Sequence, residues 1–126
     1  MSNLSRDLIK WVRDKAKSKY KKDSKCFICG SSEALDFHHF YSMTEMLKIW
    51  LRKNKFSPTT DDEIISLRDE FIESHTLEIY EKTVTLCHEH HLKLHSIYGK
   101  NPALATAEKQ ARWVVKQRDK YGMVES

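Results

Sequence analysis

Two pairs of potential metal ligands share the same spacing but stand far apart in the chain. Cys26 and Cys29 are separated by two residues, and Cys87 and His90 repeat this separation. A C-x2-C pair lets two sulfurs reach one tetrahedral ion, and three cysteines with one histidine form a known structural zinc site. The sequence therefore predicts a structural Zn²⁺ ion that joins the two segments, with the histidines on either side of His90 as alternative fourth ligands. Buried cysteines without a metal are the other interpretation.

Four further histidines occupy two short segments. His91 and His95 are four residues apart in a stretch with helical periodicity, so their imidazoles share one face of a helix. His38 and His39 are adjacent at the end of an alternating stretch, and neighbours in a strand point to opposite sides. One of these two would join His91 and His95 on a metal ion, and the other would face the substrate. Three ligands and one general base suit metal-assisted hydrolysis of a phosphate ester. Unconnected surface histidines are the alternative, and that interpretation fits His75.

Basic residues are concentrated just before the first cysteine pair. The chain has a net charge of only +4. Cations gathered in one stretch bind phosphates favourably, because condensed counterions are released. The stretch is therefore a candidate nucleic-acid contact, and a solvated helix face is the alternative. Its members are Lys10, Arg13, Lys15, Lys17, Lys19, Lys21, Lys22 and Lys25.

The elements that must position these residues are mostly helical, because glycine and proline are sparse and apolar residues recur with helical spacing. Ser42 and Thr60 each precede a glutamate by three residues, which indicates two capped helices. Gly30 is expected in the turn of the zinc knuckle, Gly99 at a helix end and Asn101 at the start of the last helix. Helices are expected at about 4–20, 43–54, 61–75, 87–98 and 102–121, and strands at about 34–40 and 78–86.

Length and composition fit a single compact domain spanning residues 1–126. Hydrophobic residues make up 40% and charged residues 32% of the chain, which is typical of a globular rather than a disordered protein. No apolar run approaches the roughly 20 residues of a membrane helix, and the first residues lack the apolar stretch of a signal peptide. We therefore expect a cytoplasmic protein without a membrane partner, whose cysteines stay reduced.

Taken together, these segments resemble the HNH endonuclease family, whose fold is the ββα-metal fold. The family pattern is a zinc knuckle, a strand ending in Asp-His or His-His, and a Leu-Cys segment that opens a metal-binding helix. The resemblance covers about residues 24–98 and is interrupted at about 43–76, which we interpret as a helical insertion between the two strands. It implies an α+β, mostly helical fold with a ββα-metal core and flanking terminal helices. The matching segments are Cys26-x2-Cys29-Gly30, Leu35-Asp-Phe-His38-His39 and Val84-Thr-Leu-Cys87-x2-His90-His91-x3-His95.

The resemblance implies a role for each matching residue. His39 corresponds to the general base that activates the attacking water, and Lys82 stands where the family usually has an asparagine. We hypothesise that Lys82 contacts DNA phosphate or stabilises the transition state. The remaining residues correspond to ligands: His38, His91 and His95 for a catalytic divalent metal, and Cys26, Cys29, Cys87 and His90 for structural zinc.

The function implied by the resemblance is metal-dependent hydrolysis of DNA phosphodiester bonds. The catalytic ion would be Mg²⁺, Mn²⁺, Ni²⁺ or Zn²⁺, and imidazole ligands favour the transition metals over Mg²⁺. DNA would be held mainly by its phosphates, through Lys15, Lys17, Lys19, Lys21 and Lys22. Compact enzymes of this kind occur in phages and would act in the host cytoplasm. The alternatives are a zinc-stabilised nucleic-acid-binding protein without catalysis and a structure-selective nuclease for branched DNA.

Overall fold

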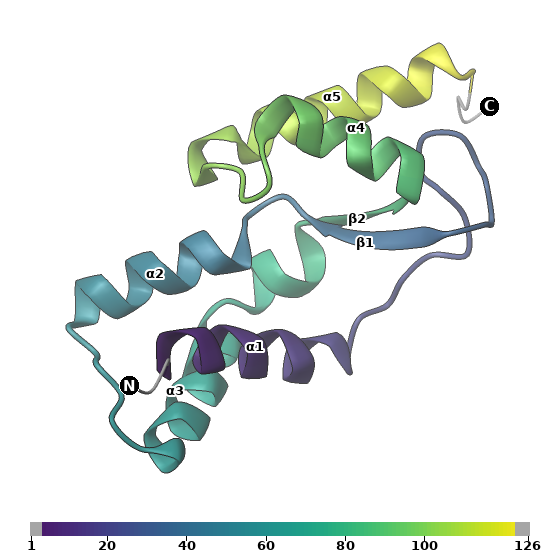
Figure 1. Cartoon of the computed structure of the whole chain (residues 1–126). Coiled ribbons are helices and arrows are strands. Elements are labelled where there is room, and N and C mark those ends of the chain that lie inside the picture. The colour runs from purple at the N-terminus through teal and green to yellow at the C-terminus, as the bar shows by residue number, and fades with distance from the viewer. Residues whose placement is uncertain (1–3, 123–126) are drawn as a thin grey trace.

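The structure, a computed structural model, describes residues 4–122 of the chain. The fold is α+β and mostly helical, as predicted, with one small two-stranded sheet (Figure 1). In the part of the chain that is described, no helix is both long and apolar enough to cross a membrane. The elements follow in the order α1 (Leu4–Lys17), β1 (Leu35–His39), α2 (Met43–Asn54), α3 (Asp61–Ser74), the π-helical turn η1 (Leu77–Glu81), β2 (Thr83–Cys87), α4 (His88–Tyr98), the 3-10 turn η2 (Leu104–Thr106) and α5 (Ala107–Lys120).

The two strands pair antiparallel, although α2, α3 and η1 lie between them in the chain. In this register Leu35 faces Cys87 and His39 faces Thr83. Cys87 is both the last residue of β2 and the N-cap residue of α4. The helix therefore starts directly from the strand and contacts both β1 and β2. Figure 1 shows α4 and α5 on one side of the strands and α1 with α3 on the other.

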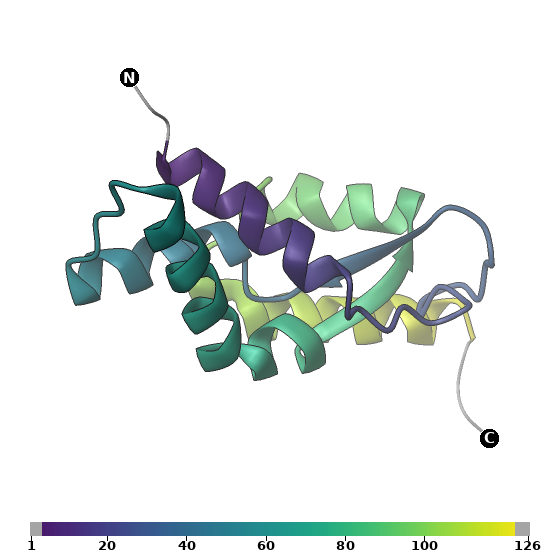
Figure 2. The same cartoon turned by 90° about the horizontal axis from the view of Figure 1, so that it is seen from below.

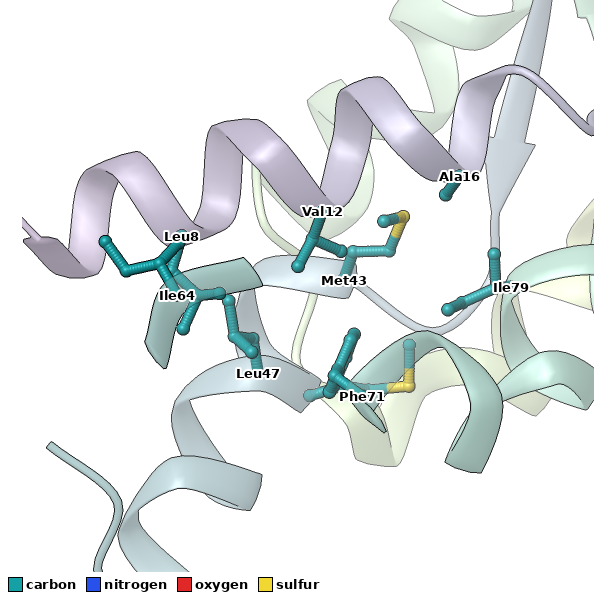
Figure 3. Close-up of a cluster of buried hydrophobic side chains, with 9 residues drawn as sticks. Leu8, Val12, Ala16, Met43, Leu47, Ile64, Phe71 and Ile79 are labelled. Atoms are coloured by element: carbon teal, nitrogen blue, oxygen red, sulfur yellow. The ribbon is translucent and has the colours of Figure 1, made fainter. Parts of the chain in front are cut away.

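Two groups of buried hydrophobic side chains form the core, one on each side of the strands. The first group joins α1, α2, α3 and η1, and Figure 2 shows α1 lying beside α3. The second joins the first cysteine pair, β2, α4 and α5. Burial of each such side chain contributes about 1.5–3 kcal/mol, so both terminal helices are fixed beside the strands. The first group is Leu8, Val12, Ala16, Met43, Met46, Leu47, Ile64, Phe71 and Ile79 (Figure 3), and the second is Cys26, Ile28, Leu86, Cys87, Leu94 and Val114.

The predicted helix caps at Ser42, Thr60 and Gly99 are confirmed. The side chain of Ser42 accepts a hydrogen bond from the Glu45 backbone N–H at 3.3 Å, and that of Thr60 accepts one from the Glu63 N–H at 3.2 Å. Gly99 ends α4 with a φ of 93°, and its N–H donates to the His95 carbonyl at 2.8 Å. These local bonds supply partners for backbone groups that a helix end otherwise leaves unpaired.

Two element starts were predicted wrongly, and tertiary packing explains both. The strand expected from residue 78 begins only at Thr83, because Leu77–Glu81 forms η1 and buries Ile79 completely in the first hydrophobic group. The helix expected from residue 102 begins only at Ala107. Pro102 is buried instead of opening the helix, and together with Asn101 it lines a pocket.

The first helix is also shorter than predicted, since α1 ends at Lys17 rather than near residue 20. Tyr20 has left the helix, and its ring stacks on Phe37 of β1 with 4.4 Å between the ring centroids. Its hydroxyl donates to the Met43 sulfur at 3.4 Å. The end of α1 is thereby attached to the strand that carries His39.

Candidate metal centres and active site

The first predicted ligand set comes together in the structure. The ligand atoms of Cys26, Cys29, Cys87 and His90 all lie within 4.8 Å of one another. The sulfurs of Cys29 and Cys87 are 3.9 Å apart, and the Cys87 sulfur lies 3.2 Å from Nδ1 of His90. A tetrahedral zinc ion with Zn–S bonds of about 2.3 Å places its sulfurs about 3.8 Å apart. The donor set and its spacing therefore fit zinc.

Local hydrogen bonds explain why the first cysteine pair forms a tight knuckle. The Gly30 N–H donates to the Cys26 carbonyl at 2.9 Å, and Gly30 adopts a φ of 75°, which a residue without Cβ reaches at no steric cost. The Phe27 N–H donates to the Thr85 carbonyl at 2.9 Å. This last bond joins the knuckle to β2, two residues before the third cysteine.

His88 and His91, the histidines nearest to His90 in the chain, contact Asp36 instead of the cysteine sulfurs. The exposed side chain of His88 bonds through Nδ1 to a carboxylate oxygen of Asp36 at 3.0 Å, and Nδ1 of His91 bonds to the same oxygen at 3.1 Å. Burial alone would raise the pKa of Asp36, but these two hydrogen bonds lower it below its usual value. Among His88, His90 and His91, only the ligand atom of His90 thus lies with the cysteine sulfurs.

The second ligand set, which the resemblance implies, also comes together. Nδ1 of His38 on β1 lies 3.1 Å from Nε2 of His91 on α4, and Nε2 of His95 lies 2.9 Å from that same His91 atom. These three residues form the second group of potential metal ligands in the described chain. The nitrogens converge on one point, which is the arrangement that three ligands of a single ion require.

The outer nitrogen of each of these three imidazoles meets an oxygen that only accepts hydrogen bonds. Nε2 of His38 donates to the side-chain oxygen of Gln110 at 2.8 Å. Nδ1 of His91 donates to Asp36, and Nδ1 of His95 donates to the Gly99 carbonyl at 2.7 Å. Each outer nitrogen must therefore carry the proton, and each inner nitrogen presents a lone pair. Such partners fix ring orientation and tautomer in metal-binding histidines.

Burial keeps the rings of His38 and His91 neutral. It lowers the pKa of His38 to about 3, although the hydrogen bond to Gln110 acts in the opposite direction. It also lowers the pKa of His91, against the hydrogen bond to Asp36. Neutral imidazoles with lone pairs directed at one another have the electronic state that a metal ligand needs. The residues present therefore fit a divalent transition metal.

His39 differs from its neighbour in one decisive respect. Its Nε2 is buried and has no hydrogen-bond partner among the described residues. Burial lowers the pKa of this ring to about 4, a hydrogen bond with the backbone of Ile79 raises it, and the charge of Arg13 lowers it. The Tyr20 and Phe37 rings pack around it, with centroids 5.1 and 5.3 Å away. The result is a neutral, fixed imidazole with one nitrogen available to accept a proton.

His39 and the three clustered histidines share one pocket of about 280 Å³. The pocket lies where α1, β1, the start of α2, α4 and the segment after α4 meet. The pocket thus brings a neutral imidazole beside three convergent imidazoles, the combination of base and ligands that metal-assisted hydrolysis uses. The other lining residues are Arg13, Lys17, Tyr20, Ser42, Met43, Lys100, Asn101 and Pro102.

The predicted basic contacts are distributed differently. Lys17 lines the pocket, whereas Lys15 pairs with Asp69 on α3 at 2.7 Å, and Lys22 donates to the Leu35 carbonyl at 3.0 Å. Lys19 and Lys21 are exposed. Among the described side chains, these five therefore do not form one uniform surface.

Lys82 is exposed and is not among the residues that line this pocket. Its backbone carbonyl accepts from the Phe40 N–H at 3.1 Å, and its own N–H donates to the Leu77 carbonyl at 2.9 Å. The Lys82 backbone thus holds η1 against the end of β1. The predicted role of its side chain at phosphate stays a prediction.

Sequence reasoning missed two residues of the site, Gln110 and Asp36, and placed a third, Arg13, only in the basic stretch. Gln110 and Asp36 orient the clustered histidines, and Arg13 lines the pocket. Asp36 lies two residues before His38, so alternation along a strand was a usable signal for it. Gln110 lies 72 residues away from its partner, and no spacing rule connects such positions.

Comparison with known families adds one finding. The phage T5 family model described as the nicking endonuclease family matches residues 2–125. No solved structure matches the chain. The match includes both α1 and α5, so the two terminal helices fall within the region that defines this family.

Proposed function

Because the chain belongs to the nicking endonuclease family, we propose that it is a metal-dependent DNA endonuclease of the HNH type. In this proposal residues 1–126 form one nuclease domain, β1, β2 and α4 form its ββα-metal core, and α2 and α3 are an insertion. DNA is the substrate, and its phosphates provide most of the contacts. The family of phage T5 supports action on DNA inside a host cell.

One observation carries this proposal: the buried, unpartnered Nε2 of His39 lies in the same pocket as three inward-facing imidazoles. Structural histidines satisfy both ring nitrogens when they are buried, since an unpaired polar atom is costly. Nε2 of His39 departs from this rule and lies in a pocket, which supports a role in binding a reactant. Water at this position would donate to it.

We assign the chemistry as follows. His39 accepts the proton of the attacking water at Nε2, while the backbone of Ile79 holds the opposite side of the ring and favours its protonated form. His38, His91 and His95 hold a divalent ion, which when bound supplies electrostatic stabilisation to the charge that develops on the phosphate. Three imidazole ligands favour Mn²⁺, Ni²⁺ or Zn²⁺ over Mg²⁺. Cys26, Cys29, Cys87 and His90 hold structural zinc that joins the knuckle to the start of α4.

Cleavage of supercoiled plasmid tests the proposal. Wild type, His39→Ala and the control Arg112→Ala are incubated with Mg²⁺, Mn²⁺ or Ni²⁺, and open circular DNA is measured. We expect wild type and the control to nick, and His39→Ala to be slower by about 10²–10⁴-fold, the usual cost of losing a general base. His39→Ala should still bind the metal, because its ring is outside the ligand cluster.

Other outcomes would point to different functions. Wild type that binds DNA but nicks it with none of these metals would be a zinc-stabilised DNA-binding protein. Cleavage restricted to branched or flapped DNA would identify a structure-selective nuclease. Equal rates for wild type and His39→Ala would refute the assignment of the base.

A further inference from the structure

Arg13 projects from the middle of α1 into the wall of the active-site pocket. It lines the same pocket as His38, His39 and His95. The Tyr20 ring lines this pocket as well, and it packs on the His39 ring with 5.1 Å between the centroids. The guanidinium is therefore close to the proposed general base, although α1 precedes the segment that resembles a nuclease core.

Thr44 holds this guanidinium in place. Nη2 of Arg13 donates to Oγ1 of Thr44 at 2.7 Å, and Thr44 is 8% exposed in the first turn of α2. A short bond to a buried hydroxyl fixes the direction of the side chain without neutralising its charge. The remaining N–H groups of the guanidinium, which has five in all, have no hydrogen-bond partner among the described residues.

Acidic partners, in contrast, go to other cations. Lys15 and Arg68 share Asp69, and Arg112 pairs with Glu108. Arg13 has no carboxylate partner within residues 4–122. The described residues lining the pocket include three permanent cations, Arg13, Lys17 and Lys100, and no carboxylate. This group of cations without carboxylates suits an anionic ligand, and a planar guanidinium matches two phosphate oxygens at once.

We propose that Arg13 binds the non-bridging oxygens of the phosphodiester that is cut, and that Thr44 is the positioning residue that directs it there. This inference rests on the proposed nuclease function and adds a substrate-binding residue to it. The cleavage site is then built jointly by α1, by the start of α2 and by the histidines of β1 and α4. A clamp on the phosphate orients it for attack by the water on His39.

Single-turnover cleavage and DNA binding test the proposal with five proteins: wild type, Arg13→Ala, Arg13→Lys, Thr44→Val and the matched control Arg112→Ala. Arg13→Ala should cleave about 10–100-fold more slowly, the effect of losing a hydrogen bond to a charged group. Arg13→Lys should restore DNA binding more than the cleavage rate. It keeps the positive charge but loses the planar guanidinium that contacts two phosphate oxygens. Arg112→Ala should match wild type, since its side chain is exposed and pairs with Glu108.

A double-mutant cycle separates positioning from simple structural damage. Thr44→Val should slow wild type several-fold but have no further effect in the Arg13→Ala background, because the two residues act through one contact. An equal loss in both backgrounds would overturn the role of Thr44. Binding to DNA across salt concentrations gives a second measurement, made with the structural zinc retained and no catalytic metal added. Arg13→Ala should reduce the salt slope by about one phosphate.

The nuclease function and the role of Arg13 would be refuted by different results. If wild type cleaves and Arg13→Ala cleaves equally fast, Arg13 does not bind the reacting phosphate and the inference is wrong, while the nuclease function stands. If wild type binds DNA but never cleaves it, the nuclease function is wrong. An unchanged salt slope in Arg13→Ala would then overturn the phosphate contact as well.

Discussion

Gln110 on α5 is fully buried, and its side chain makes three hydrogen bonds. Its oxygen accepts from Nε2 of His38 at 2.8 Å, and its amide nitrogen donates to the Phe40 carbonyl at 3.2 Å and to the Thr106 hydroxyl at 2.9 Å. Replacement by leucine keeps a similar volume but removes all three bonds. We expect two separable consequences, one for stability and one for metal binding.

The stability loss can be worked from these contacts. Each buried hydrogen bond contributes about 1 kcal/mol net, so Gln110→Leu should lower the free energy of unfolding by about 3 kcal/mol. That is a large part of the roughly 5–15 kcal/mol that holds a typical domain folded. Metal affinity at the histidine cluster should fall by about 10–100-fold, the usual effect of losing a partner that orients a ligand. Nε2 of His38 would no longer be held as the protonated nitrogen.

Gln110→Glu separates the two effects. Its carboxylate still accepts from His38 but cannot donate to the Phe40 carbonyl, so stability should fall while metal affinity stays within a few-fold of wild type. Gln117→Leu on the same helix is the control, since no side-chain hydrogen bond of Gln117 is present in the described chain. Denaturant unfolding followed by circular dichroism measures stability, and calorimetric titration with Ni²⁺ measures affinity. Wild-type Ni²⁺ affinity in Gln110→Leu would refute the idea that Gln110 orients His38.

Three further perturbations have expected results. Stripping zinc with a strong chelator should lower the melting temperature steeply, since structural zinc contributes on the order of 10 kcal/mol; an unchanged melting curve with no zinc left by metal analysis would exclude a structural ion. Lys82→Ala should weaken DNA binding less than about tenfold and leave the cleavage rate at saturating DNA unchanged, because the side chain is exposed and does not line the pocket. A drop of about 100-fold in that rate would place Lys82 at the transition state. Thr60→Ala should lower the free energy of unfolding by about 1 kcal/mol through loss of the α3 cap. Denaturant unfolding compares it with the control Ser66→Ala, and equal stability of the two variants would argue against the cap.

The pairs within each candidate ligand set were predictable because each pair depends on local geometry. Cys26 with Cys29, and Cys87 with His90, lie at spacings that a knuckle and a first helical turn bring within reach of one ion. His91 and His95 share a helix face for the same kind of reason. The helix caps at Ser42 and Thr60 are local as well. Where a candidate site or a helix cap needs residues three or four positions apart, their spacing in the sequence predicts the contact directly.

Element boundaries failed where packing opposed local preference. Ile79 and Tyr80 favour strands, yet both lie in η1, because Ile79 fills the first hydrophobic group and the Tyr80 ring meets that of Tyr20 with 6.0 Å between centroids. Asn101 and Pro102 form a familiar helix start, but they lead the chain along the pocket instead. A local signal is overridden when the residue it concerns has a partner distant in the chain.

The same limit explains why the reactive residues were easier to find than the residues that support them. A ligand or a base is recognised by its own chemistry, whereas Gln110 and Arg13 are ordinary residue types whose roles come only from their neighbours. One orients His38 from α5, and the other reaches the pocket from α1. Both helices lie outside the 24–98 segment that resembles a nuclease core and inside the region that the family match covers. The core segment contains the candidate ligands and Asp36 but lacks Gln110 and Arg13, so we propose that the unit that carries the proposed chemistry is the chain with both terminal helices.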